Sequence, residues 1–311
     1  MSDAHLTSRA PASSTDPGPL PGSLHDVPGW FFPTDVVLFD WFLTAQAREQ
    51  RRGDLLEMGA YLGKSAVFMG EHLSPGEIFT VCGLFGSEAP DGDNGAEVRG
   101  SYATLTRRAF EANYLSFHDE LPRVLQAPTS VVPGSVVDGS CRFVHIDASH
   151  LYEHVRADIV AARDALEPDG IVVLDDYRSE HTPGVACATW QAMLEEGLRP
   201  VCVSPNKFYG TWGDPAPVRR DLVEAMRGRS DCGVSTQEVA GHPLVIVNGR
   251  KAKPPRLPVS RHHGPGRAAP APARNGRNGL RRLAKDWLPP VLFRGLARGV
   301  RAARGRVSRT G

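Results

Sequence analysis

Three aspartates follow two neighbouring apolar runs in the middle of the chain. FVHIDASHLYEHVRADI (143–159) places Asp147 at the end of a predicted strand, and GIVVLDDYRSEH (170–181) places Asp175 and Asp176 at the end of the next. The carboxyl ends of parallel strands meet at one edge of a sheet, so we expect these carboxylates to crowd together. Crowded carboxylates repel one another unless a cation joins them, and oxygen ligands favour Mg²⁺ or a similar ion over zinc.

His150 follows Asp147 by three residues, and either side chain could serve as a general base. For His150 two other interpretations stay open, as an additional metal ligand or as a cap of the helix that follows. The sequence thus predicts a metal site made by Asp147, Asp175 and Asp176.

A glycine-containing loop lies earlier in the chain. LLEMGAYLGKSAVF (55–68) contains G-x-x-x-G-K-S, one residue short of the triphosphate-binding loop G-x-x-x-x-G-K-[ST]. Backbone N–H groups and the lysine of such a loop gather negative charge, which an acid directly before the loop opposes. Glu57 stands there, which argues against ATP or GTP and suits a ligand with cationic or hydroxyl groups. Gly59 and Gly63 allow the backbone to turn sharply and approach a ligand, although a plain strand-to-helix turn has the same pattern.

The elements that position these residues follow from the apolar pattern. Short apolar runs alternate with amphipathic segments, which predicts an α/β fold: a mostly parallel sheet with helices on both faces and ligands at the carboxyl ends of the strands. The predicted strands are 55–58, 78–85, 123–127, 143–147, 171–176, 200–203 and 243–248, and the predicted helices are 64–73, 104–115, 151–166 and 185–198.

Two aromatic segments frame this region. PGWFFPTD and NKFYGTWG contain bulky rings that would either roof a substrate pocket or pack in the core, and core packing is the more common fate. The residues concerned are Trp30, Phe31, Phe32, Phe208, Tyr209 and Trp212.

Three motifs in register give the chain a family resemblance: E-x-G-x-Y-x-G-K-S, I-D-x-x-H-x-Y-E-x-V-x-x-D and G-x-x-x-x-D-D-Y. Over about residues 50 to 215 it resembles the class I S-adenosylmethionine (SAM) methyltransferases of the macrocin O-methyltransferase and cephalosporin-hydroxylase-like group, which are related to catechol-type O-methyltransferases. The resemblance implies a Rossmann-like fold, SAM as cofactor, and a divalent ion on the three aspartates. It implies that SAM is bound by Glu57, Gly59, Tyr61, Gly63 and Ser65, and that Ser130 contacts the adenosine, although an ordinary loop serine is the more common interpretation of Ser130.

One position departs from that family pattern. Class I methyltransferases usually carry an acid at the end of the second strand, where it binds the ribose hydroxyls. In TVCGLFG this place falls on Gly83. Either Glu88, Asp91 or Asp93 in the following loop supplies the carboxylate, or the cofactor binds weakly.

Charge and composition divide the chain. Its 311 residues carry a net charge of +1, but residues 251–311 carry +15 and the rest −14. Composition predicts a disordered N-terminal segment (1–27), a folded domain (28–250), a Pro/Gly/Arg-rich linker (251–278) and a basic amphipathic tail (279–311). The tail suits an anionic membrane surface or a partner's groove; a solvated tail and docking on the acidic body are the alternatives. The sequence contains no motif of the kind that reads nucleic-acid bases, so we expect no specific binding to nucleic acid.

Cysteine usage and the N-terminus bear on location. Five cysteines, an odd number without a C-x-x-C pair, indicate reduced thiols rather than a disulfide framework. The N-terminus lacks a basic and apolar leader, and no run of about 18 apolar residues occurs, so we expect a cytoplasmic protein.

These observations predict a SAM-dependent, Mg²⁺-dependent O-methyltransferase that acts on a small hydroxylated molecule such as a sugar or a natural-product scaffold. Three other hypotheses stay open. They are a triphosphate-binding enzyme, a Rossmann-type NAD oxidoreductase, and a binding module that has kept the fold without catalysis.

Overall fold

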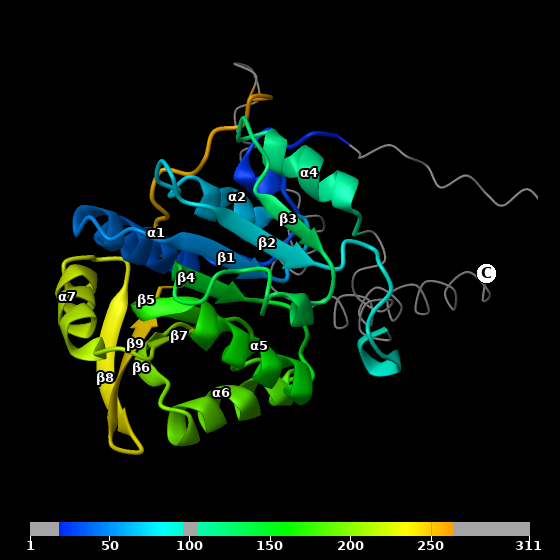
Figure 1. Ribbon diagram of the computed structural model, residues 1–311. Coiled ribbons are helices and arrows are strands. Elements are labelled where there is room, and N and C mark those ends of the chain that lie inside the picture. The colour runs from blue at the N-terminus through cyan, green and yellow to red at the C-terminus, as the bar shows by residue number, and fades with distance from the viewer. Residues whose placement is uncertain (1–18, 96–104, 250, 264–311) are drawn as a thin grey trace, which may run out of the picture.

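The structure, a computed structural model, describes residues 19–95, 105–249 and 251–263. Its centre is a nine-stranded sheet in the order β3-β2-β1-β4-β5-β7-β6-β9-β8 (Figure 1). The strands are β1 (Asp54–Met58), β2 (Phe79–Gly83), β3 (Arg123–Gln126), β4 (Cys141–Ile146), β5 (Leu166–Leu174), β6 (Arg199–Val203), β7 (Phe208–Thr211), β8 (Gly233–Val239) and β9 (His242–Asn248). Strands β1 to β5 run parallel, as predicted, and β7 is antiparallel to both of its neighbours.

Helices cover both faces of the sheet. The cluster on one face includes residues of α1 (Pro33–Arg48), α2 (Lys64–Gly70), α4 (Arg107–Leu115) and α7 (Pro215–Arg227). The cluster on the other face includes α5 (Tyr152–Ala165) and α6 (Pro183–Glu195). All residues of β4 are buried, which is typical of a strand covered on both sides. The predicted fold class, a Rossmann-like α/β sheet with helices on both faces, is confirmed.

Two of the α-helices and two of the strands that the structure describes were not predicted. Helix α1 buries side chains around most of its circumference, so it lacks the one-sided apolar stripe that identifies a surface helix. Helix α7 begins with Asp214 as N-cap and Pro215 in its first turn. Strand β7 was interpreted only as an aromatic segment, and β8 is mostly exposed. The short strand β7 matters most for the site, because it pairs with β5.

The predicted segment boundaries need correction at both ends of the domain. Residues 19–27, assigned to a disordered segment, include a 3₁₀ turn at Leu24–Asp26, and both Leu24 and Val27 are buried. Residues 251–263, assigned to a linker, pack on the body: the Ser260 hydroxyl donates to the Pro21 carbonyl, and Ser260 is buried. Composition alone does not predict this packing, because residues such as Ser260 and Pro21 that contact each other are distant in sequence. Residues 1–18 and the basic tail (279–311) lie outside the described residues.

None of the helices that the structure describes is long and apolar enough to cross a membrane.

Candidate functional site

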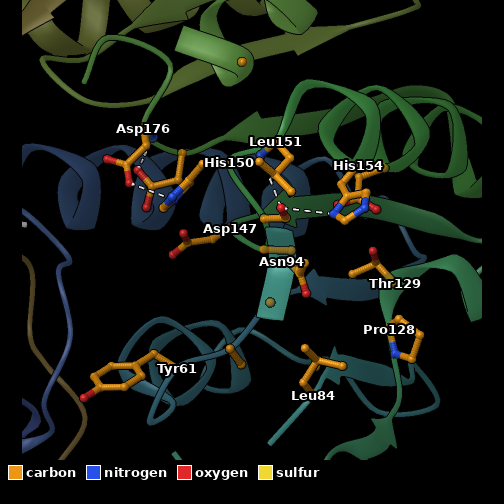
Figure 2. Close-up of a pocket in the computed structure, with 18 of the residues that line it drawn as sticks. Tyr61, Leu84, Asn94, Pro128, Thr129, Asp147, His150, Leu151, His154 and Asp176 are labelled. Carbon is orange, nitrogen blue, oxygen red and sulfur yellow. Dashed lines mark hydrogen bonds and ion pairs between the residues drawn. The ribbon is translucent and has the colours of Figure 1, made fainter. Parts of the chain in front are cut away.

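A cavity of about 1120 Å³ opens at the carboxyl ends of the parallel strands. Figure 2 shows Asp176 and His150 on one side of it, Pro128 and Thr129 on the other, and Asp147 between them. The backbone continues the sheet register past the strand ends: the amide of Asp147 donates to the Met58 carbonyl. The three strands β1, β4 and β5 therefore deliver their following loops to one place, as the sequence predicted.

The loop after β1 depends on a glycine. Gly59 has φ +87°, and a Cβ added there would lie 2.1 Å from the carbonyl oxygen of Asp147. Only a residue without a side chain fits, since both the dihedral angle and the space exclude others. Gly63, with φ +90°, precedes α2 and faces the ring of Phe110. Gly59 therefore lets the β1 loop lie directly against the β4 loop, and Gly63 lets the start of α2 pack against α4.

The predicted cofactor residues divide into two groups. Gly59, Tyr61 and Ser130 line the cavity. Glu57, Gly63 and Ser65 are not among the lining residues, and Glu57 is fully buried beneath the loop. Burial raises the pKa of Glu57 to about 7, against the opposing effects of the Ser65 hydroxyl and of Lys207. Its oxygen Oε1 lies 2.9 Å from Nδ1 of His145 on the neighbouring strand β4, so Glu57 holds the strand ends together.

Tyr61 stands where the common motif has a glycine. Its ring stacks on that of Trp30 at a centroid distance of 5.7 Å and an interplanar angle of 27°. Both rings line the cavity, together with Phe32. Of the aromatic residues considered from sequence, Phe208 and Tyr209 are instead buried in the core.

The end of β2 carries no acid. Gly83 lines the cavity, and an added Cβ would meet the Phe85 ring at 3.3 Å. In the loop that follows, Oδ1 of Asp91 accepts from the amide of Asn94, and Oδ2 lies 2.9 Å from Nε2 of His154 on α5. Asp91 is thus engaged in closing the loop onto α5, and neither Glu88 nor Asp93 lines the cavity.

The three predicted aspartates all line the cavity, but they have different partners. Asp175 is held from behind: Oδ2 binds the ammonium of Lys207, and Oδ1 accepts from the side-chain amide of Asn206 at 2.6 Å. Asp176 accepts from Ser179 at 2.7 Å and lies 3.4 Å from Nε2 of His150.

These surroundings shift the pKa values of Asp147 and Asp176 in opposite directions. Burial raises the pKa of Asp147 well above its usual range, and the neighbouring charge of Asp175 adds to that rise. Burial acts in the same direction on Asp176, but the hydrogen bond and charge of His150 and the Ser179 hydroxyl outweigh it and lower the pKa. Asp147 is therefore suited to accept a proton and Asp176 to remain ionised.

Among the described residues, two sets of donor atoms lie close enough to hold a metal ion. One is His145, Asp147 and Asp175, and the other is Asp147, His150 and Asp176, with the atoms of each set within 4.8 Å of one another. The first set is adjacent to the Lys207 ammonium, which opposes a second cation. The second set joins two carboxylates with an imidazole at the cavity wall, and it fits a divalent ion.

Sequence reasoning missed His145, Asn206 and Lys207. The signal for the last two was present in SPNK (204–207), which has the proline and asparagine of a tight turn. The Ser204 hydroxyl accepts from the amides of Asn206 and Lys207, and the turn places both beside the end of β5.

Residues 56–177 match the family model described as a methyltransferase domain. Among solved structures, the chain is similar to the O-methyltransferase NovP, with a TM-score of 0.48 at 17% identity, over 58% of this chain and 80% of NovP. No curated protein matches the chain.

Two further solved structures are similar. CalS11, a TDP-rhamnose 3′-O-methyltransferase of calicheamicin biosynthesis, gives a TM-score of 0.39 at 17% identity, over 58% of this chain and 80% of CalS11. The O-methyltransferase TomG from Streptomyces achromogenes, in complex with SAM, gives a TM-score of 0.30 at 14% identity, over 67% of this chain and 83% of TomG. None of these three structures reaches a TM-score of 0.5, so the similarity to known proteins rests on the family model.

The family model covers the glycine loop and all three aspartates, and the sheet orders its strands as the motifs require. Over residues 56–177 the chain is thus similar to the methyltransferase domain family.

Proposed function

We propose that this protein is a SAM-dependent O-methyltransferase for a small hydroxylated acceptor, of the sugar or natural-product type. The observation that carries the proposal is that the glycine loop after β1 and the carboxylates after β4 and β5 line one cavity. A cofactor on the loop and an acceptor hydroxyl beside the carboxylates would be neighbours there. Holding two reactants in contact is the main contribution a protein makes to methyl transfer.

The cofactor would lie along Gly59 to Tyr61, with Gly83 and Ser130 at its other side. Glu57 and Ser65 would act indirectly, by fixing the loop from below, rather than by touching the cofactor. SAM supplies the methyl group when bound. Since Asp91 is occupied by His154, the ribose hydroxyls would be bound without a carboxylate from β2 or its loop.

The acceptor end would carry a divalent cation, Mg²⁺ by the chemistry of its ligands. Asp147 and Asp176, with His150, would hold it, and the ion would supply Lewis-acid activation of the hydroxyl. Asp175 would contribute through Asp147, because its own oxygens are already bound by Lys207 and Asn206. Asp147 lines the cavity beside the acceptor end and would take the hydroxyl proton, with His150 as the second candidate.

The proposal is tested by binding before activity. Calorimetry should give saturable binding of S-adenosylhomocysteine (SAH), the demethylated product of SAM, and no comparable binding of ATP or NAD. Methyl transfer to a panel of hydroxylated sugars and phenols should then fall on chelation with EDTA and return with Mg²⁺ or Mn²⁺. Tight ATP or NAD binding without SAH binding would refute the function, and full activity in EDTA would refute the metal.

The basic tail (279–311) lies outside the described residues, and we propose that it binds anionic membrane surfaces from the cytoplasmic side. Its support is compositional: arginines alternate with large apolar residues over this segment. Co-sedimentation with vesicles should need anionic lipid, weaken with salt and disappear when 279–311 are deleted. Equal binding to neutral vesicles would contradict the electrostatic basis.

A further inference from the structure

Lys207 is a cation buried behind the acidic end of the cavity. Its side chain is 1% exposed, and it is not among the residues that line the cavity. The tight turn at Ser204 fixes its backbone, and the first residues of β7 pair with β5 directly beyond it. A lysine is almost never fully buried unless it is paired, so its partners indicate what it does.

The contacts of Lys207 connect the two loops of the site. Its ammonium binds Oδ2 of Asp175 and lies 3.2 Å from Nε2 of His145. An ammonium can only donate, so Nε2 of His145 accepts and Nδ1 carries the proton that it donates to Glu57. A continuous buried chain therefore runs from Glu57 under the glycine loop, through His145 and Lys207, to Asp175.

The single positive charge of Lys207 is surrounded by several carboxylates. Burial opposes a charged Lys207, but Asp175, Asp147 and Asp35 raise its pKa above the usual value, so the ammonium persists. Asp35, on α1, accepts through its Oδ1 from the Tyr209 hydroxyl. The Lys207 ammonium therefore supplies part of the positive charge that the crowded carboxylates at the end of the cavity require.

We infer that Lys207 is the resident counter-ion of the acidic end: it positions Asp175 and lowers the affinity of Asp147, His150 and Asp176 for a divalent cation. The inference rests on the proposed function for the meaning of that cation, but not for its measurement. Lys207 acts through Asp175 and so is a positioning residue. The charge of Lys207 reaches Asp147 and Asp176, so it repels a divalent ion that binds there, and its contact with Asp175 keeps that carboxylate from turning toward the ion.

The decisive measurement is Mn²⁺ binding to Lys207→Met, by paramagnetic resonance of the free ion and by the shift of Tm. Removing the ammonium should tighten Mn²⁺ binding about tenfold or more, because the repulsion from one nearby unit charge is lost. Tm without metal should fall, since Asp175 is left as an unpaired buried charge, and saturating Mn²⁺ should raise it more than in the wild type. Unchanged or weaker Mn²⁺ binding would overturn the inference.

Two further variants serve as controls for charge and for folding. Lys253→Met removes the same charge from an exposed position, and it should leave Mn²⁺ binding as in the wild type. If Lys207→Met does not fold, the double variant Lys207→Met/Asp175→Asn should fold, because neither partner is then left charged. A double variant that stays unfolded would show that Lys207 has a role other than neutralising Asp175, and would overturn the inference.

SAH binding separates this inference from the proposed function. If the wild type and Lys207→Met both bind SAH but have the same Mn²⁺ affinity, the counter-ion role fails and the methyltransferase proposal stands. If Mn²⁺ binding tightens as expected while no form binds SAH, the counter-ion role stands and the proposed function fails.

Discussion

The two sides of the cavity are built from different kinds of group. The glycine-loop side presents backbone and small side chains, such as Gly59, Ala60 and Gly83, and its specificity lies in shape. The acidic side collects ionisable side chains from loops after β4 and β5 and from the β6–β7 turn, and its properties lie in charge balance. A shape can be encoded by one short motif, whereas charge balance requires partners that are distant in sequence.

The largest expected effect breaks the shape of the glycine-loop side. Gly59→Ala forces a Cβ against the Asp147 carbonyl at φ +87°, so we expect more than about 3 kcal/mol of destabilisation and no measurable SAH binding. Gly76→Ala is the matched control, because Gly76 has φ +86° but nothing within 4 Å. It should cost about 1–2 kcal/mol and leave SAH binding intact. Equal loss of stability in chemical unfolding and equal SAH affinity in calorimetry for the two variants would show that the Asp147 carbonyl does not exclude a side chain at position 59.

The next effect breaks the charge balance of the acidic side. Asp176→Asn removes one charge from the proposed metal ligands, and methyl transfer should fall about 10²-fold or more while SAH affinity stays within a factor of about two. Asp164→Asn, at an exposed position on α5, should change neither. If SAH affinity falls as steeply as turnover, the two sides are not separable in the way their composition indicates.

Asp158 sharpens the comparison, because it is a buried carboxyl in the cavity wall away from the acidic cluster. Burial raises its pKa to about 7, against the Thr129 hydroxyl and His154. The unfolded chain ionises near pH 4, so ionisation costs the folded state stability as pH rises from about 4 to 7. The stability gain of Asp158→Asn should therefore be larger at pH 8 than at pH 5 by about 2–3 kcal/mol.

Urea unfolding at the two pH values measures that difference for Asp158→Asn. Glu153→Gln, at an exposed position on the same helix, serves as the control and should show no such dependence. A gain that is independent of pH would mean that Asp158 stays ionised in the folded protein.

The smallest effect concerns the missing acid of β2. Gly83 has no positive φ, and an aspartate there needs the Phe85 ring to move by only a few tenths of an ångström. Gly83→Asp should tighten SAH binding by about 1 kcal/mol through hydrogen bonds from the ribose hydroxyls. Gly83→Ala isolates the cost of the Cβ alone. No gain of Asp over Ala in calorimetry would indicate that Gly83 does not face the ribose.

What the sequence predicted reflects the same contrast. The glycine loop, the parallel strands and the meeting of Asp147 with Asp175 and Asp176 were predicted because each depends on short-range pattern plus one topological rule. The pairing of Asp175 with Lys207 was not, since it needs an antiparallel strand whose neighbours are decided by the whole sheet. The engagement of Asp91 by His154 was missed because it joins the loop after β2 to helix α5, which are distant in sequence.

Strand β8 ends the sheet opposite β3, and its outer edge has no neighbouring strand among the described residues. An open edge is a template on which another chain can add a strand, and long apolar edges lead to aggregation. Ser235 to Glu238, which are all exposed, give β8 a hydrophilic outer rim and end in a charge. The hairpin of β8 and β9 thus lengthens the sheet beyond β6 and finishes it with residues that discourage further growth.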